Sequence, residues 1–130
     1  MKALLPPGWP RPNGYTNGIS ASGRTIYTAG VVGWDAQEYF VADNLPGQFA
    51  QVLRNILAIL AVDGAGPQHL VRMTCYVTSI DAYVDGIAEI GAAWKDVIGP
   101  HYPAMALVEV VRLVDPQAMV EIEATAVVPG

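Results

Sequence analysis

The sequence predicts a two-layer α+β domain with the element order ββαβαββ. Three observations lead to this prediction. Two segments have apolar residues at helical spacing, and five others alternate or are rich in β-branched residues, as strands are. Of the 130 residues, 52% are hydrophobic and 15% are charged, so the chain can bury one sizeable core. We find no linker, repeat or low-complexity segment, and residues 1–130 are therefore expected to form one domain.

The N-terminal part is expected to begin with an extended arm over residues 1–13, because four prolines there prevent a helix. Residues 15–21 and 24–32 follow, and both are rich in β-branched and aromatic side chains. Between them lies Ser22-Gly23, a dipeptide typical of turns. The pattern predicts a β-hairpin.

Two later segments have apolar residues spaced as on one face of a helix. The first follows helix-start residues at 43–46 and ends at the glycines and proline of 64–67. The second begins near Ser79 or Asp81 and ends at residues 99–100 (Gly-Pro). The apolar positions are Phe49, Val52, Leu53, Ile56, Leu57 and Leu60 in the first segment, and Tyr83, Ile87, Ile90, Trp94, Val97 and Ile98 in the second.

Three strands are predicted around the second helix. Residues 70–78 alternate, with Val71, Met73, Cys75 and Val77 on the face expected to be buried. Residues 104–113 and 118–127 are expected to form two strands around a turn at Asp115-Pro116.

In the last strand the alternation places two carboxylates on one face. If Val120, Ile122, Ala124 and Ala126 pack under the helices, then Glu121, Glu123 and Thr125 point the other way. Burying an unpaired carboxylate is costly, so at a subunit interface these groups must be hydrated, paired or functional.

Composition and charge exclude several classes of function. The net charge of −5 disfavours binding to nucleic acid. One cysteine and two histidines, widely spaced, predict neither a disulfide nor a metal site, and no cofactor motif is present. No apolar run that could span a membrane is expected, so the chain is predicted to be cytoplasmic. The low charged fraction favours an oligomer.

Several segments together carry a family resemblance. They are NGYTNG, TAG, VRMTCYVTSIDAY, PAMALVEVVRL and VEIEATAVV, spread over residues 14–128. In order and spacing they resemble the Rid family of enamine and imine deaminases, also called the YjgF or L-PSP family. The resemblance implies a chorismate-mutase-like fold of the bacillus type, a homotrimer, and three ligand clefts between subunits.

The resemblance also implies site residues. Active family members carry Pro-Ala-Arg-Ser, whose arginine holds the substrate carboxylate. This sequence has Met105 and Ala106 at the last two positions, so that clamp is absent. Glu121 matches the glutamate that positions the hydrolytic water, and Tyr15 matches the cleft tyrosine.

The family's Ser-Gly-Gln segment is Ala-Gly30-Val31 in this sequence, which removes two further polar groups. Two other residues are candidates for the cleft. Trp34 is expected either to contact another subunit or to form a wall against the ligand. His101 precedes the motif proline and either reaches the cleft or caps the surface near the helix end.

Three functions are therefore considered. The first is hydrolytic deamination of an atypical enamine or imine, such as an aminomuconate-type compound. The second is non-catalytic binding of a metabolite by a trimer, which the absent arginine favours. The third is the endoribonuclease activity ascribed to some L-PSP proteins, which the acidic composition disfavours.

Overall fold

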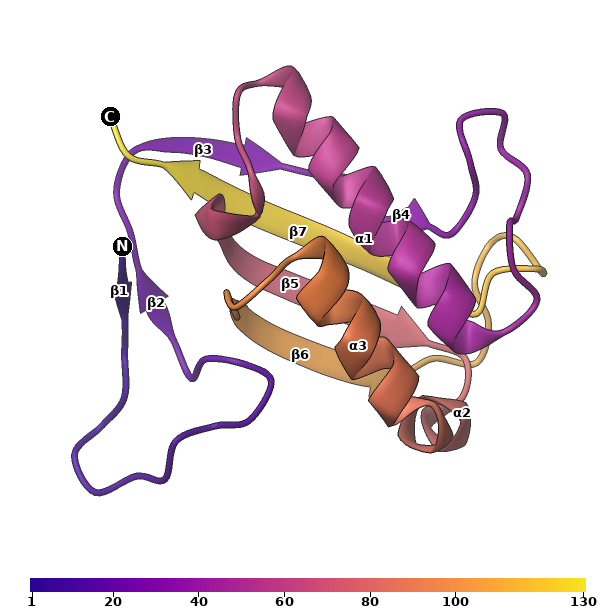
Figure 1. Cartoon of the computed structure of the whole chain (residues 1–130), viewed down its shortest axis with the longest axis horizontal. Coiled ribbons are helices and arrows are strands. Elements are labelled where there is room, and N and C mark those ends of the chain that lie inside the picture. The colour runs from indigo at the N-terminus through magenta and orange to yellow at the C-terminus, as the bar shows by residue number, and fades with distance from the viewer.

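The computed structural model describes all 130 residues, and its centre is a five-stranded sheet with the main helices on one face (Figure 1). The strand order is β3 (Arg24–Tyr27), β7 (Val120–Val128), β5 (Leu70–Val77) and β6 (Ala104–Glu109). The short strand β4 (Val31–Val32) also pairs with β7. Only β5 and β6 run parallel, and this mixed sheet confirms the α+β class.

Helix α1 (Leu45–Val62) forms where the sequence predicts it. The side chain of Asn44 caps it by accepting a hydrogen bond from the Gly47 amide at 2.8 Å. Contrary to the expectation, α1 is long and apolar enough in composition to cross a membrane, with a mean hydropathy of 1.3. One side of it packs on the sheet, as a core helix does, and its buried apolar residues are Leu45, Phe49, Val52, Leu53, Ile56 and Leu60.

The second predicted helix is two helices, α2 (Ile80–Asp85) and α3 (Ile87–Val97), which meet at Gly86. Ser79 caps α2, in agreement with one of the two predicted starts. A Cβ at position 86 would lie 2.8 Å from Cγ of Pro46 at the start of α1. Packing against α1 therefore requires glycine at this junction, and glycine is also a poor residue for continuing a helix.

The predicted N-terminal hairpin is wrong. Strand β1 (Lys2–Ala3) pairs with β2 (Ile19–Ser20) in a separate two-stranded sheet, while β3 pairs with β7. Gly23 has φ +143°, and a Cβ there would lie 2.1 Å from the Val128 carbonyl oxygen. This glycine allows close approach to the end of β7 instead of turning the chain into a hairpin. Figure 1 shows β1 and β2 side by side beyond the end of the main sheet, and part of the predicted extended arm is therefore a strand.

The two C-terminal strands form, but they are not neighbours. β5 lies between β6 and β7, because β6 pairs in parallel with β5 and β7 pairs with it from the other side. β6 ends at Glu109, four residues before the predicted end. From α1 onward, the predicted order of helix, strand, helix, strand and strand is confirmed.

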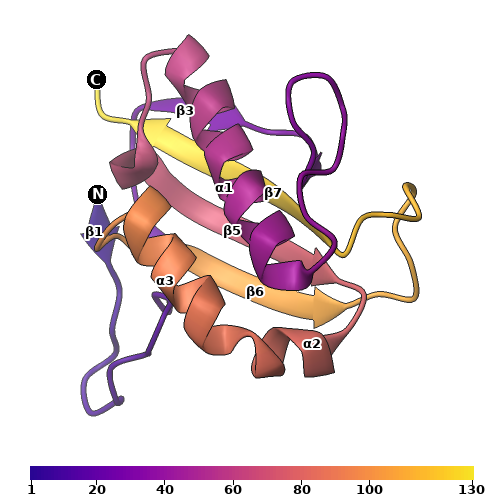
Figure 2. The same cartoon turned by 45° about the vertical axis from the view of Figure 1, so that its right-hand side comes forward.

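The two faces of the sheet differ in their cover. In β7, Val120, Ile122, Ala124 and Ala126 are buried under the helices, and the predicted alternation is confirmed. In β5 a register shift between Leu70 and Arg72 buries Leu70, whereas Val71 is only partly buried. Both views show helices on one face only, and we call the other side the open face (Figures 1 and 2).

Candidate active site

The two predicted carboxylates lie on the open face, next to a tyrosine of the neighbouring strand. Tyr76 of β5 is opposite Glu121 of β7, and Thr74 is opposite Glu123. The Tyr76 hydroxyl donates a hydrogen bond to the Glu123 carboxylate at 3.0 Å. This bond, with smaller contributions from desolvation and from the charges of both glutamates, raises the pKa of Tyr76 above 10.0. Tyr76 therefore stays a hydrogen-bond donor at neutral pH.

The Glu121 side chain lies against the backbone at Gly30. A Cβ at position 30 would be 2.7 Å from Glu121 Oε2 and 2.8 Å from its carboxyl carbon. The single ion pair of the structure joins Arg24 to Asp63, so Glu121 has no ion-pair partner within the chain. The side chain of Val31 is buried in the core, 8% exposed, so only its backbone is available to a ligand.

Met105 lies on the other side of the sheet. It is paired in register with the buried Met73, and its sulfur is 3.7 Å from Cys75 Sγ. Tyr15 is held beside it, because the Thr16 amide donates to the Pro103 carbonyl at 3.1 Å along the start of β6. Tyr15 and Met105 line one cavity of about 450 Å³, whose other walls include Tyr83, Trp94, Tyr102 and Leu107.

Ala106 follows Met105 in β6, so its side chain lies on the opposite face of the sheet. It is exposed and pairs with Thr74 of β5. The candidate residues therefore fall into two groups. Glu121, Gly30 and Ala106 belong to the open face and its edge, whereas Tyr15 and Met105 line the cavity on the helix side.

His101 and Trp34 both make contacts that hold the fold. His101 Nε2 donates to the Leu70 carbonyl at 2.6 Å, and the His101 carbonyl accepts from Trp94 Nε1 at 3.1 Å. His101 also lines a cavity between the N-terminal segment and the start of β6, together with Tyr15. The ring of Trp34 is 5.9 Å from that of Phe40, and its carbonyl accepts a hydrogen bond from α1.

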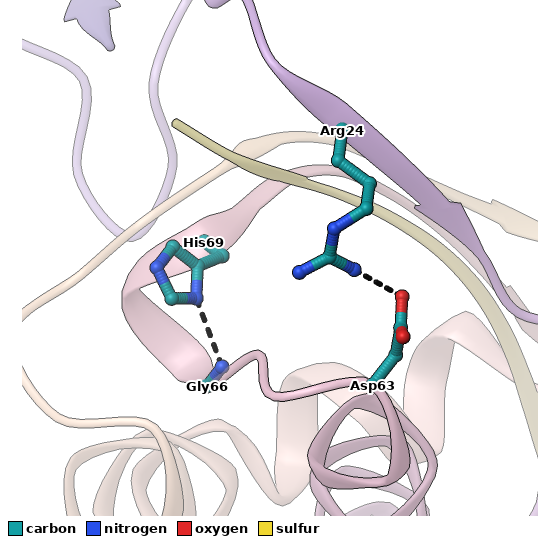
Figure 3. Close-up of polar contacts among 4 residues, drawn as sticks. All are labelled: Arg24, Asp63, Gly66 and His69. Carbon is teal, nitrogen blue, oxygen red and sulfur yellow. Dashed lines mark hydrogen bonds and ion pairs between the residues drawn. The ribbon is translucent and has the colours of Figure 1, made fainter. Parts of the chain in front are cut away.

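Two other polar side chains, Arg24 and His69, have structural partners. Arg24 forms its ion pair with Asp63 at the end of α1, which joins β3 to that helix (Figure 3). His69 Nδ1 accepts a hydrogen bond from the Gly66 amide at 2.9 Å (Figure 3). No cluster of three or more His, Cys, Asp or Glu side chains could hold a metal ion.

Tyr76 is the functional candidate that sequence reasoning missed. The alternation along β5 predicts that Tyr76 and Cys75 lie on opposite faces of the sheet. It does not predict which strand pairs with β5. Only the pairing of β5 with β7 places the hydroxyl at the glutamates.

Comparison with known proteins places the chain in a family. The family model described as "Endoribonuclease L-PSP" matches residues 10–128. The chain belongs to the Rid (L-PSP) family. Its Rid relatives include a RutC family protein of Synechocystis, 31% identical over 99% of this chain and 98% of that protein. A 2-iminobutanoate/2-iminopropanoate deaminase of Salmonella typhimurium is 29% identical over 87% of this chain and 86% of that enzyme.

Solved Rid structures show the same fold. The Rid family protein YyfB of Yersinia pestis superposes with a TM-score of 0.84 at 30% identity, covering 98% of both chains. Rv2704 of Mycobacterium tuberculosis, described as a member of the YjgF/YER057c/UK114 family, superposes with a TM-score of 0.67 at 31% identity, covering 88% of this chain and 87% of that one.

Proposed function

We propose that this Rid-family protein is a hydrolytic deaminase of small enamines or imines. The observation that carries the proposal is the Glu121 carboxylate, which lies on the open face against Gly30 and forms no ion pair within the chain. A carboxylate in this position can accept a proton from water and later return it. The net reaction converts an imine and water into a carbonyl compound and ammonia.

Glu121 serves both proton transfers in turn. The carboxylate removes a proton from water as the oxygen attacks the imine carbon, and the C=N bond becomes a C–N single bond. The proton then passes from Glu121 to the nitrogen. Glu121 next takes the hydroxyl proton of this intermediate and passes it to the amino group, so that the C–N bond breaks, the C=O bond forms, ammonia leaves, and the Glu121 carboxylate is regenerated. An enamine substrate first tautomerises to the imine.

We infer that the complete site is a cleft between subunits of a homotrimer. Within one chain, Glu121 and Met105 lie on opposite faces of the sheet, so one chain does not bring both groups to one small ligand. The resemblance to the Rid family implies ligand clefts between subunits, and we propose that in each cleft the open face of one subunit meets the Tyr15 side of another. Trp34 and His101 remain proposed as cleft residues through their positions near these two edges.

The proposed substrate differs from the smallest 2-imino acids. Methionine at position 105 supplies no charge, and Ala106 supplies no hydroxyl, so the carboxylate clamp of the active family members cannot form. Loss of a bidentate charged contact costs on the order of 2–4 kcal/mol, or about 30- to 1000-fold in rate. We therefore expect weak turnover of 2-iminopropanoate, and an aminomuconate-type compound remains a candidate.

A metabolite-binding trimer without turnover is the second candidate, and the uncharged Met105 is the observation that favours it. A deaminase releases ammonia from an imine, whereas a binding protein is only stabilised by its ligand. The net charge of −5 disfavours ribonuclease activity.

The test compares Glu121→Gln with Glu123→Gln, two changes of equal shape two residues apart on β7. Imines are generated in situ by an amino-acid oxidase from alanine, leucine and phenylalanine, and unreacted imine is trapped with semicarbazide. We expect Glu121→Gln to lose about 100-fold or more of the turnover, and Glu123→Gln to keep most of it. Full turnover by Glu121→Gln, or dissociation of its oligomer, would show that Glu121 is structural.

A further inference from the structure

Helix α3 contains a glycine that neither its backbone nor its neighbours require. Gly91 lies in the middle of the helix, where glycine is the poorest residue after proline. Its φ is not positive, and a Cβ built there has no heavy atom within 4 Å. Gly91 is exposed to solvent and lines the cavity of about 450 Å³. Gly91 therefore keeps this cavity open.

The same face of α3 presents one residue on each turn to the cavity. Ile87, Gly91 and Lys95 follow at intervals of four, and all three line it. Ile87 forms an apolar wall at one end, and Lys95 places an ammonium group at the other. The volume lies within the range of small-molecule sites, about 300–1,000 Å³.

The lining of the cavity is apolar with a single charge. Most of its side chains are aliphatic or aromatic, and Trp94 and Tyr102 stack with ring centroids 5.8 Å apart and planes at 7°. Lys95 is the one cation of the lining, and no carboxylate lines it. Lys95 also forms no ion pair, since the single pair of the structure is Arg24 with Asp63.

We propose that this cavity binds an apolar monocarboxylate, with the branched or aromatic side chain beside Gly91 and Met105 and the carboxylate at Lys95. Lys95 then supplies the positive charge for the ligand carboxylate that the uncharged Met105 cannot supply. The chain has a net charge of −5, so this isolated ammonium is the group that favours an anion here. Identifying this ligand as the substrate rests on the proposed function, but binding itself does not.

Calorimetric titration of the full chain with three stable probes tests the proposal. They are 3-phenylpropanoate, propanoate, which lacks the ring, and 3-phenyl-1-propanol, which lacks the charge. We expect 3-phenylpropanoate to bind at least about ten-fold more tightly than either of the others, since burying the ring and pairing the carboxylate both contribute.

Matched variants locate the binding. Gly91→Leu places a large side chain at the cavity and should abolish binding of 3-phenylpropanoate, whereas Ala92→Leu, on the same helix but outside the lining of the cavity, should not. Lys95→Gln should weaken this probe about ten-fold and leave 3-phenyl-1-propanol unchanged. Arg54→Gln removes an equal charge from an exposed position of α1 and should change neither affinity. Gly91→Ala, a milder change that favours the helix, should weaken 3-phenylpropanoate less than leucine does.

Three results would overturn the proposal: equal affinity for 3-phenylpropanoate and propanoate, unchanged binding in both Gly91 variants, or a change of oligomeric mass in Gly91→Ala, which would show that another subunit fills the cavity. The outcomes for binding and for turnover are separable. Tight binding of 3-phenylpropanoate without imine hydrolysis would contradict the proposed deaminase activity and support the proposed binding site. Imine hydrolysis by the wild type, together with unchanged binding in the Gly91 variants, would support the deaminase activity and contradict the binding site.

Discussion

Two glycines near β4 differ in what a side chain at each position would meet. At Gly30 the nearest atom to a built Cβ is the tip of the Glu121 side chain, which can move. At Gly33 the nearest atoms are the carbonyl oxygen of Gln48 at 2.8 Å and its Cα at 3.0 Å, in the backbone of α1. The first contact therefore controls the position of a carboxylate, and the second controls the distance between helix and sheet.

We expect Gly30→Ala to fold normally but to lose most of the turnover, because the new methyl group displaces the Glu121 carboxylate. Gly33→Ala should instead lower the free energy of unfolding by about 1–3 kcal/mol, because backbone must move. Urea denaturation and the imine assay measure the two effects. Normal turnover in Gly30→Ala would show that the contact with Glu121 has no role in the reaction.

Cys75 is a buried thiol whose titration affects stability in alkali. Burial raises the pKa of the Cys75 thiol from 9.0 to about 12. The folded state thus holds this proton more tightly than the unfolded state does. The resulting stability is fully present below pH 9 and is lost as the pH rises toward 12, by about 1.4 kcal/mol per unit.

Cys75→Ala should remove this pH dependence. At pH 7 the variant should be less stable than the wild type by about 1 kcal/mol, because it loses buried volume. Between pH 9 and pH 11 the difference should shrink and then reverse, since only the wild type exposes an ionising thiol on unfolding. Urea denaturation at pH 7, 9, 10 and 11 measures it, and a constant difference would contradict the assigned pKa.

At the scale of elements, one buried amide joins α1 to two loops. Gln48 is 1% exposed, and its Nε2 donates to the carbonyls of Ala42 at 3.1 Å and Gln117 at 3.0 Å. Its Oε1 accepts from the Met119 amide at 2.8 Å. Both loops lie at the same end of the sheet, where α1 begins (Figure 1). Gln48 therefore fixes the approach to β7, the strand that carries Glu121.

Gln48→Ala should lower the free energy of unfolding by about 3 kcal/mol, because three backbone groups lose their partner inside the protein. Gln51→Ala is the matched control on the same helix. Gln51 has one hydrogen bond, to Asn55 at 2.9 Å, and its loss should cost no more than about 0.5 kcal/mol. Equal costs for the two variants, measured by urea denaturation, would mean that the two loops do not depend on Gln48.

At the scale of the whole molecule, the helices cover only one face of the sheet. The open face combines Glu121, Glu123 and Tyr76 with the exposed apolar Val108 of β6, 44% exposed, and Tyr27 of β3, 75% exposed. A sheet face with such residues favours contact with another subunit. This is the surface on which the proposed trimer depends.

We expect light scattering at micromolar concentration to give three times the chain mass of 13.8 kDa. Val108→Asp should shift the mass toward that of one chain, because it places a charge on the open face. Val62→Asp adds the same charge to α1 at a position 89% exposed and should leave the mass unchanged. A wild-type mass of 13.8 kDa would exclude the trimer.

Local patterns in the sequence determined those parts of the molecule that depend on near neighbours along the chain. Helical spacing and the cap at Asn44 predict α1, and alternation predicts which side of β7 Glu121 takes, because both signals repeat within a few residues. The Ser79 cap follows from the same local chemistry. The composition also predicts one large apolar core, which these elements form.

Tertiary structure decided what depends on distant partners. Ser22-Gly23 has the composition of a hairpin turn, but pairing with β7 outweighs it, because β7 offers a long partner strand and the local hairpin does not. Gly86 interrupts a helical pattern where Pro46 packs on it. The parallel pairing of β5 with β6 sends Met105 to the helix side, opposite Glu121. Strand register is a long-range property, so only the folded chain shows which residues Glu121, Tyr76 and Met105 contact.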